Sequence, residues 1–326
     1  MANVVKEETV FRKIAAAFAA SRTSLTGVRL GIGDDAALFA PRTGCETILS
    51  CDWFLEGTHF LRDKHPAEAV GWKSLGRAMS DLAAMGGTPR CFLLSMALPT
   101  ELTGRWLTGF LGGIRGASEK FGCVAAGGDT TRRKEILINI TVVGEVKKGR
   151  ALLRSGARVG DELFVSGTLG EAELGLRQLR KKKGLARATN AALRKHLYPE
   201  PRIALGQWLA EKRLATAMMD LSDGLSTDLL RLCAASGVGA KVEAAALPCV
   251  GSRDRADGLA LALHGGDDYE LLFSVSEKQA KHVPKSYRGL ALTRIGKIVA
   301  GKSIKLALGD SRERTLAPGG WDPFRE

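Results

Sequence analysis

The sequence has no long hydrophobic run and no apolar leader. No segment approaches the roughly 20 consecutive apolar residues that a membrane-spanning helix needs. The N-terminal residues include the acids Glu7 and Glu8 instead of the apolar core of a secretory signal. We therefore expect a cytoplasmic protein that does not cross a membrane.

Paired cysteines are also lacking. The six cysteines are scattered, and they form no CxxC pair and no zinc-ligand spacing with histidine. This excludes a zinc ribbon and argues against a disulfide framework in a chain of 326 residues. We expect reduced thiols, buried or half-buried, at all six positions: Cys45, Cys51, Cys91, Cys123, Cys233 and Cys249.

Aromatic residues are few, at 6%, whereas positive charge is in excess, with a formal net charge of +13. Such a charge is compatible with nucleic-acid binding or with attraction of anionic substrates. Much of the excess lies in residues 177–196, RQLRKKKGLARATNAALRKH, which contain none of the aromatic residues that stack on single-stranded nucleic acids. We favour a solvated helix and loop there, and we do not expect nucleic-acid binding.

The chain is long enough for two domains with separate cores. Apolar residues spaced four apart predict helices over 7–20, over 67–85 and around Trp106–Ile114. Strands are predicted at Thr47–Ser50, Phe92–Leu98, Ile136–Val146, Glu162–Ser166 and Leu271–Val275. A turn-rich segment at 154–161 begins a second series of elements. The pattern predicts a mixed α/β fold with domains at 1–149 and 150–326.

Acidic residues recur beside glycines or near the ends of predicted strands. The motifs are GIGDDAALF (31–39), ILSCDWF (48–54), SDLAAMGG (80–87), GGDTT (127–131), MMDLSDGLSTDLL (218–230) and GGDDYELLF (265–273). One Asp next to Gly is most often a turn former or a helix cap. Six such places favour a shared site, because acids that follow strands meet at one edge of an open sheet.

Carboxylates without cysteine or histidine partners suit magnesium or manganese better than zinc. Such ions neutralise clustered carboxylates and bridge them to phosphate oxygens. The sequence contains neither a Walker A motif nor the protein-kinase motifs, so ATP must be held in another way. Glycines beside the acids let backbone N–H groups approach phosphates, and Arg154 can offset charge on the transferred group. These features predict an enzyme that uses magnesium or manganese ions to bind a phosphate-bearing substrate such as ATP.

The same motifs, together with CDWFLEGTHF (51–60), RSGARVGD (154–161), SGVGA (236–240) and the closing GGWDPF (319–324), occur in a recognisable order. From about residue 6 to residue 324 the chain resembles the thiamine-monophosphate kinase family. That family belongs to the superfamily of aminoimidazole ribonucleotide synthetase and selenophosphate synthetase. The resemblance implies an N-terminal sheet domain that forms a homodimer and a C-terminal α/β domain that completes the cleft. It also implies transfer of the ATP γ-phosphate to thiamine monophosphate, giving thiamine diphosphate, with several Mg²⁺ ions bound.

The resemblance further implies a set of site residues. Those that match magnesium ligands are Asp35, Ser50, Cys51, Asp52, Asp81, Asp129, Asp220 and Asp223. Those that match ATP contacts are Gly128, Asp129, Arg154 and Ser222, with Asp129 and Arg154 stabilising charge and no residue acting as general base. Those that match contacts to thiamine monophosphate are His59, Asp267 and Trp321. Asp34 is expected to support its loop, and Asp228 to be a surface or capping residue.

Three positions depart from the family pattern. Asp267 stands where Glu is usual, so its contact to the pyrimidine end of the acceptor is expected to be longer or water-mediated. Cys51 stands where Thr is usual, but a backbone carbonyl can be the ligand there. GGWDPF replaces a G-aromatic-D-H-F ending, and Trp321 keeps an aromatic face for a thiazolium cation. The acceptor could therefore be a related pyrimidine–thiazole phosphate.

Two related enzymes are the main alternatives. Selenophosphate synthetase needs a reactive Cys or selenocysteine in a glycine-rich N-terminal loop, and neither Cys45 nor Cys51 has that setting. The hydrogenase-maturation member carries a C-terminal cysteine, whereas this chain ends in DPFRE.

Overall fold

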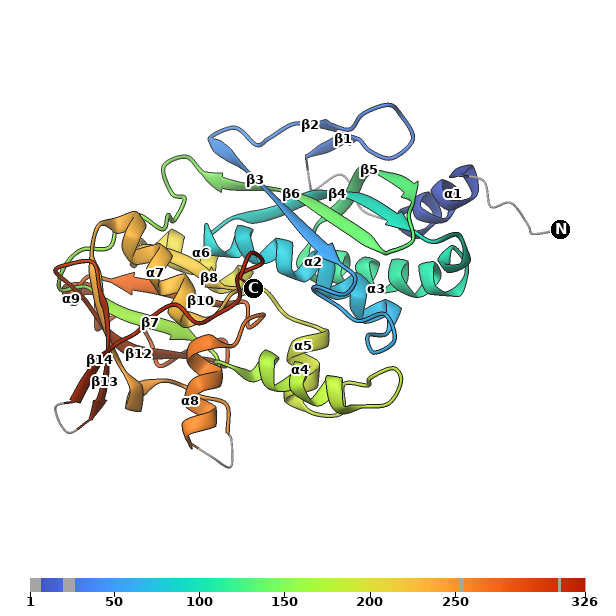
Figure 1. The fold of residues 1–326 in the computed structure, drawn as a ribbon. Coiled ribbons are helices and arrows are strands. Elements are labelled where there is room, and N and C mark those ends of the chain that lie inside the picture. Colours follow the sequence, from blue (N-terminus) through green and yellow to red (C-terminus); the bar gives the residue numbers. More distant parts are fainter. Residues whose placement is uncertain (1–6, 20–26, 252–254, 310–311, 326) are drawn as a thin grey trace. The chain divides into compact units, whose positions relative to one another are not determined.

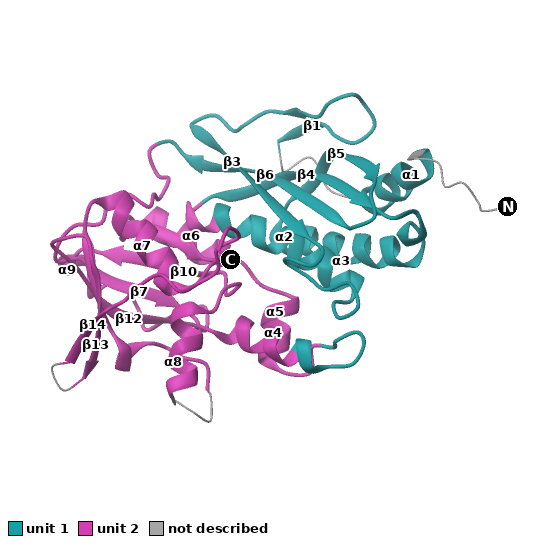
Figure 2. Ribbon diagram, viewed as in Figure 1, with its two compact units in different colours: residues 1–82, 87–148, 179–187 teal, residues 83–86, 149–178, 188–326 magenta. Residues whose placement is uncertain are grey.

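The computed structural model describes residues 7–19, 27–251, 255–309 and 312–325 (Figure 1). The chain divides into two compact units, coloured separately in Figure 2. Unit 1 comprises residues 1–82, 87–148 and 179–187, and unit 2 comprises residues 83–86, 149–178 and 188–326. The chain thus leaves unit 1 for unit 2 at Lys148–Gly149, and the domain limits of 1–149 and 150–326 stay a prediction.

Unit 1 is built on a four-stranded sheet in the order β3-β6-β4-β5. The β3–β6 and β4–β6 pairs are antiparallel, whereas β4 and β5 are parallel. Its strands are β1 (Val28–Leu30), β2 (Leu38–Phe39), β3 (Cys45–Leu55), β4 (Thr88–Leu98), β5 (Val124–Arg132) and β6 (Leu137–Lys147). Its helices are α1 (Glu7–Phe18), α2 (Ala67–Ala84, whose last two residues fall in unit 2), the 3-10 helix Thr100–Leu102 and α3 (Arg105–Phe121).

The helices of unit 1 confirm the prediction made from apolar residues spaced four apart. In α1, Val10 and Phe18 are buried, and the Phe18 ring lies 5.8 Å from that of Phe92 on the sheet. Helix α2 begins directly after Pro66, whose carbonyl accepts the N–H of Val70. Proline is well suited to that position because its missing N–H has no intrahelical partner there.

One strand of unit 1 is longer than expected and another was not expected at all. The segment predicted as Thr47–Ser50 continues through Asp52 to Leu55, and the apolar stretch before GGDTT forms, together with that motif, the unpredicted strand β5. Polar residues at half-buried or edge positions interrupt the hydrophobic run without ending the strand. The prediction that Asp52 lies just past a strand is therefore wrong.

Unit 2 contains an eight-stranded mixed sheet in the order β14-β13-β9-β12-β7-β10-β8, with β11 paired to β12. Its strands are β7 (Glu162–Ser166), β8 (Ala215–Leu221), β9 (Gly239–Glu243), β10 (Glu270–Val275), β11 (Ser286–Tyr287), β12 (Leu290–Val299), β13 (Ile304–Gly309) and β14 (Arg312–Thr315). Its helices are α4 (Glu171–Lys181, whose last residues fall in unit 1), α5 (Ala191–Leu197), α6 (Ile203–Lys212), α7 (Leu225–Ser236), the 3-10 helix Ala244–Ala246, α8 (Arg255–His264) and α9 (Glu277–Ala280).

Apolar side chains pack on both faces of the unit 2 sheet. Leu272 belongs to a core cluster that includes Leu229 of α7, whereas its neighbours Leu271 and Phe273 belong to a second cluster with Leu209 of α6. Alternate residues of a strand point to opposite faces, so β10 is covered on both sides. This explains why its sequence reads as a continuous apolar run and confirms the mixed α/β class.

The basic segment 177–196 forms the end of α4, a loop and α5. The loop is held within unit 1, where Lys64 Nζ donates to the Lys182 carbonyl (2.6 Å) and Ala186 N–H donates to the Lys64 carbonyl (2.7 Å). Lys195 on α5 is only 11% exposed and pairs with Glu270. The helix and loop are confirmed, but the segment is not wholly solvated.

None of the helices in the described part of the chain is long and apolar enough to cross a membrane. None of the six cysteines, all of which lie in the described part of the chain, forms a disulfide. The expectation of buried or half-buried thiols is wrong for Cys51, because its side chain lies on the exposed face of β3, and is confirmed for the other five.

Candidate functional site

In unit 1, β3 and α2 bring together three of the predicted magnesium ligands. Ser50 Oγ donates a hydrogen bond to Asp81 Oδ2 on α2. Asp52, two residues further along β3, has its Oδ2 3.7 Å from Arg77 Nε. The guanidinium of Arg77 lies 5.5 Å from the centre of the Phe54 ring, which is buried. Ser50, Asp52 and Asp81 therefore supply oxygen atoms that can bind a metal ion on one side of the sheet, and the Arg77 guanidinium lies beside Asp52.

Asp129 lies on the opposite edge of this sheet. The register aligns Asp52 with Ile140, Leu94 and Gly128 in one row across the four strands. Three strand spacings correspond to about 14 Å. Gly128, with a φ of 155°, lies so close to β4 that a Cβ there would be 1.9 Å from the Leu94 carbonyl oxygen. Only glycine permits this close approach of β5 to β4. The next residue, Asp129, therefore lies on the far edge strand, well away from Asp52.

The Asp34–Asp35 pair lies in the exposed turn between β1 and β2. Asp34 Oδ1 accepts the backbone N–H of Asp35 (2.8 Å), which agrees with Asp34 supporting its loop. A Cβ built on Gly31, at the start of the turn, would lie 3.9 Å from the Ala126 carbonyl oxygen. The turn that carries Asp35 therefore begins beside β5.

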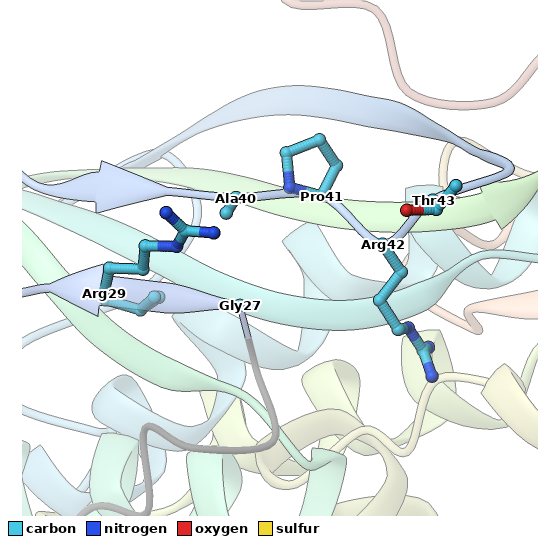
Figure 3. A pocket seen from close by; sticks show the side chains of 7 residues that line it. Gly27, Arg29, Ala40, Pro41, Arg42 and Thr43 are labelled. Atoms are coloured by element: carbon cyan, nitrogen blue, oxygen red, sulfur yellow. The ribbon is translucent and has the colours of Figure 1, made fainter.

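A shallow pocket of about 530 Å³ lies along the same hairpin (Figure 3). Its lining includes Arg29, Pro41 and Arg42. Arg42 pairs with Glu145, whose carboxylate accepts hydrogen bonds from the backbone N–H (2.8 Å) and from the Nε (3.0 Å) of Arg42. None of the predicted site residues lines this pocket.

His59 lies in the turn after β3. The ring nitrogen Nδ1 of His59 accepts the backbone N–H of Leu55 (3.0 Å), and the backbone N–H of His59 donates to the Leu55 carbonyl (2.9 Å). Because Nδ1 is an acceptor, the neutral imidazole carries its hydrogen on Nε2. The ring centre lies 5.8 Å from that of Phe54.

In unit 2, a buried carboxylate holds the turn between β8 and α7. Asp228 Oδ2 accepts the N–H groups of Asp223 (2.9 Å) and Gly224 (3.1 Å). Burial and the neighbouring charge of Asp223 raise the pKa of Asp228 to about 7. The expectation of a surface residue is wrong, because Asp228 is fully buried, but its capping role is confirmed.

Arg231 joins the two carboxylates of this turn. Its Nη1 donates to Asp223 Oδ2 (2.5 Å) and to Asp228 Oδ1 (2.9 Å). Arg231 is not among the site residues predicted from the sequence, although residues three apart on a helix, such as Asp228 and Arg231, lie on the same face. Asp220, at the end of β8, is only 4% exposed.

Both acceptor-contact candidates of unit 2 are attached to the same turn. Asp267 N–H donates to the Ser222 carbonyl (2.8 Å), and Trp321 N–H donates to the Asp223 carbonyl (2.9 Å). The Tyr269 hydroxyl donates to Asp267 Oδ1 (2.7 Å). Trp321 remains 47% exposed. The structure therefore brings together Ser222, Asp223, Asp267 and Trp321.

Arg154 lies at the other end of α7. The hydroxyl of Ser236, the last residue of α7, donates to the Arg154 carbonyl (2.9 Å). Asp223 precedes the first turn of this 12-residue helix, which spans about 18 Å. The structure does not bring the backbone of Arg154 close to Asp223.

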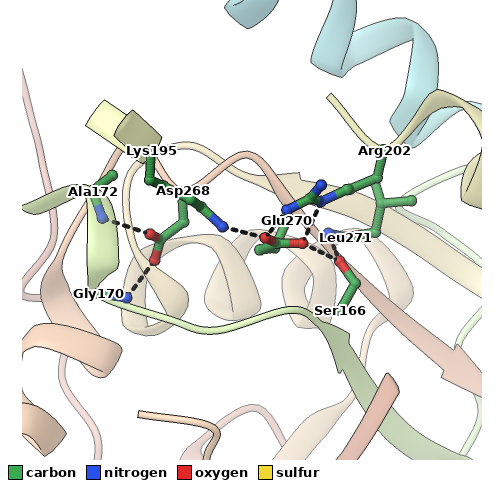
Figure 4. A network of polar contacts seen from close by, with 8 residues as sticks. All are labelled: Ser166, Gly170, Ala172, Lys195, Arg202, Asp268, Glu270 and Leu271. Carbon is green, nitrogen blue, oxygen red and sulfur yellow. Dashed lines mark hydrogen bonds and ion pairs between the residues drawn. The ribbon is translucent and has the colours of Figure 1, made fainter. Parts of the chain in front are cut away.

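The GGDDYELLF motif contributes a buried polar network that the sequence analysis did not foresee (Figure 4). Asp268 accepts the N–H groups of Gly170 (2.5 Å) and Ala172 (3.1 Å), and burial raises its pKa to about 7. Burial acts in the same direction on Glu270. However, Lys195 and Arg202 outweigh it and hold the pKa of Glu270 below its usual value.

The predicted metal ligands of unit 1 do not all lie together: Ser50, Asp52 and Asp81 are close to one another, whereas Asp129 lies on the opposite edge strand. Among the residues that the structure describes, no three or more His, Cys, Asp or Glu side chains are arranged to hold a metal ion. The expectation of acids meeting at one sheet edge is thus not met inside unit 1. The physical reason is that Asp52 and Asp129 lie within the two outer strands and not after them.

Comparison with known proteins places the chain in a family. Residues 33–146 match the AIR synthase related protein N-terminal domain, and residues 158–309 match the corresponding C-terminal domain. Thiamine-monophosphate kinase of Escherichia coli strain K12 is 37% identical over 322 residues, covering 96% of this chain and 98% of that protein. The chain belongs to the thiamine-monophosphate kinase family.

Solved structures of thiamine-monophosphate kinases support this assignment. The enzyme from Stenotrophomonas maltophilia K279a superimposes with a TM-score of 0.80 at 36% identity, covering 90% of this chain and 94% of that chain. The structure of AaThiL complexed with AMPPCP and TMP has a TM-score of 0.75 at 31% identity, with coverages of 98% and 97%. The protein is thus a phosphotransferase with the AIR synthase-like fold, as expected. The two alternative enzymes are set aside.

Proposed function

We propose that this protein transfers the γ-phosphate of ATP to thiamine monophosphate and so forms thiamine diphosphate. The observation that carries the proposal is the turn at residues 222–224. It joins the nucleotide candidate Ser222 and the metal candidate Asp223 to the two acceptor candidates of unit 2, Asp267 and Trp321. The similarity to AaThiL complexed with AMPPCP and TMP, over nearly the whole chain, supports the same pair of substrates.

We propose that several Mg²⁺ ions take part. The candidate donors are oxygen atoms, which Mg²⁺ prefers at about 2.0–2.1 Å, so two ligands of one ion lie within roughly 4 Å of each other. Asp52 and Asp129 are separated by about 14 Å of sheet, which one ion cannot span. The proposed ligands are Asp35, Ser50, the Cys51 carbonyl, Asp52, Asp81, Asp129, Asp220 and Asp223. When bound, the ions would neutralise the phosphates and bridge them to these carboxylates.

The transfer that we propose is direct and in-line, without a general base. The acceptor is a phosphate that is already ionised, so no proton has to be removed, and positioning and charge stabilisation suffice. Gly128 and Ser222 would contact ATP, and Asp129 and Arg154 would also stabilise charge. His59 Nε2–H, Asp267 and the exposed face of Trp321 would contact thiamine monophosphate.

The purified protein, given ATP and Mg²⁺, should release ADP only when thiamine monophosphate is present. We expect one molecule of thiamine diphosphate to form for each ADP released, with the thiamine diphosphate measured by chromatography. ADP release without diphosphate formation would contradict the proposed acceptor and direct attention to Asp267 and Trp321. A phosphorylated residue trapped after incubation with ATP alone would contradict direct transfer.

We also propose a homodimer formed through the exposed apolar part of the unit 1 sheet, on the face that carries Leu49. Leu49, Trp53 and Leu93 are 68%, 57% and 36% exposed. Leu49 and Trp53 alternate along β3 with Ile48 and Phe54, which are buried. An apolar sheet face of this kind is typical of a protein–protein contact, and a second copy of the same sheet is self-complementary.

Leu49→Arg should convert the dimer to a monomer, because it places a charge in an apolar contact without disturbing the buried face. Light scattering coupled to gel filtration measures the mass. Leu185→Arg is the matched control, since Leu185 is similarly exposed (61%) but lies outside the sheet. A wild-type monomer, or a Leu49→Arg dimer, would argue against this interface.

A further inference from the structure

The C-terminal segment 316–321, here called the strap, is attached to the first turn of α7 by consecutive backbone donors. Gly319 N–H donates to Ser226 Oγ (3.1 Å), and Gly320 N–H donates to Thr227 Oγ1 (3.1 Å). The next residue, Trp321, donates to the Asp223 carbonyl (2.9 Å). Three successive N–H groups of the strap are thus satisfied by the segment that follows β8.

Both ends of this attachment are firmly built. At the start of the strap, Leu316 is buried in the unit 2 core and its N–H donates to the Ile304 carbonyl (2.9 Å). Ser226 is fully buried, and its hydroxyl lies 2.9 Å from His264 Nδ1. Burial, followed by the charge of Arg314, lowers the pKa of His264, which favours a neutral ring. In the tautomer with its hydrogen on Nε2, His264 Nδ1 accepts the Ser226 hydroxyl hydrogen. The hydroxyl oxygen is then oriented to accept from the strap.

The strap also packs closely against the first turn of α7 and the turn that precedes it. A Cβ on Gly320 would lie 1.9 Å from the Asp223 carbonyl oxygen and 2.8 Å from Thr227 Oγ1. A Cβ on Gly319 would lie 2.6 Å from His264 Nδ1. The two glycines of GGWDPF therefore permit a close approach of the strap, and any side chain at Gly320 must lift it.

We propose that Ser226 and Thr227 are positioning residues that hold the strap so that the exposed indole of Trp321 lies beside the Ser222–Asp223 turn, and that they thereby set the affinity for the acceptor. This inference rests on the proposed function, because it assigns the strap to the thiamine phosphate and not to ATP. Thr227 Oγ1 accepts the Gly320 N–H, which is its link to the strap. Its effect passes through the Gly320 N–H to the neighbouring Trp321.

The test compares steady-state constants of the full-length protein for both substrates. Thr227→Val removes the acceptor oxygen with almost no change of shape, and we expect the KM for thiamine monophosphate to rise about two- to tenfold. The KM for ATP should stay near its wild-type value. Thr227→Ser keeps the hydroxyl and should restore the wild-type constants. Gly320→Ala should raise the acceptor KM more than Thr227→Val does.

Two further comparisons separate positioning from a general structural effect. Gly251→Ala is the control, because a Cβ at Gly251 meets no atom within 4 Å. In a Trp321→Ala background, Thr227→Val should add little further increase, since its effect requires the indole. Equilibrium dialysis of thiamine monophosphate should show the same order of affinities.

Equal changes in both KM values, or a thermal midpoint lowered without a change in acceptor affinity, would overturn the inference. So would an acceptor KM raised by Trp321→Ala but not by Thr227→Val or Gly320→Ala, and the proposed function would then still stand. A wild-type protein that forms no thiamine diphosphate would instead overturn the proposed function, before any variant is compared.

Discussion

Asp223→Asn is expected to lower kcat by about 10²- to 10³-fold, the usual effect of removing one preorganised electrostatic contact. The substitution keeps the shape of the side chain and removes its charge. The turn itself should persist, because Asp228 still accepts the N–H groups of residue 223 and Gly224. The loss should therefore come from weaker Mg²⁺ binding, and the Mg²⁺ concentration that gives half-maximal rate should rise. Rates measured over a magnesium series test both points.

The structure adds a reason why Asp223 is a sensitive position. Arg231 donates to both Asp223 and Asp228, so a cation already faces Asp223 in the protein described here. A divalent ion at Asp223 has to share that carboxylate with Arg231 or displace it. Asp63→Asn is a suitable control, because the Asp63 side chain is 73% exposed, and it should leave kcat and the magnesium dependence unchanged. Near-normal turnover of Asp223→Asn would remove Asp223 from the metal ligands.

The elements that sequence reasoning found are those with regular spacing and a clear stop. Helix α2 follows Pro66 and ends before Gly86, and α1 shows the four-residue spacing of Val10 and Phe18. Strand β10 was found because both of its faces are covered, which makes its central residues Leu271–Phe273 a continuous apolar run. In each case, local sequence carries the information that determines the element.

The elements that were missed depend on contacts far along the chain. Ser50 and Asp52 look like the end of a strand, yet they lie within β3 because its neighbour β6 pairs with every residue from Cys45 to Leu55. The local sequence does not indicate that a segment pairs with a strand about 90 residues away. The separation of Asp52 from Asp129 follows from the strand order, which no motif reveals.

The motif GGDDYELLF illustrates the same limit within the candidate site. Its composition indicates glycines beside acids, and the resemblance to the family selects Asp267. The structure shows that the following acids are buried and have separate partners, Gly170 and Ala172 for Asp268 and the cations of Lys195 and Arg202 for Glu270. These partners are 68 to 98 residues away, so only the fold discloses them.

Glu270→Gln is expected to destabilise unit 2 by about 3–5 kcal/mol, because it leaves two half-buried cations without the buried carboxylate that neutralises them. Glu270 is fully buried; it accepts hydrogen bonds from Arg202 Nε (2.7 Å) and Arg202 Nη2 (2.5 Å) and also pairs with Lys195. Ser166 Oγ adds a further donor at 2.5 Å, which the amide of Gln can satisfy only in part. A loss of this size corresponds to a fall of about 6–20 °C in the thermal midpoint of a domain of 150–250 residues.

Differential scanning calorimetry of the whole chain would measure this change, with Glu277→Gln as the control. Glu277 belongs to the same unit, but its side chain is 76% exposed, so its loss should alter the midpoint by little. If the penalty comes from uncompensated charge and not from lost packing, replacing Glu270, Lys195 and Arg202 together by apolar residues should recover much of the stability. A Glu270→Gln midpoint equal to that of the control would show that the two cations find water or another anion. The network would then contribute little to holding Asp267 beside the 222–224 turn.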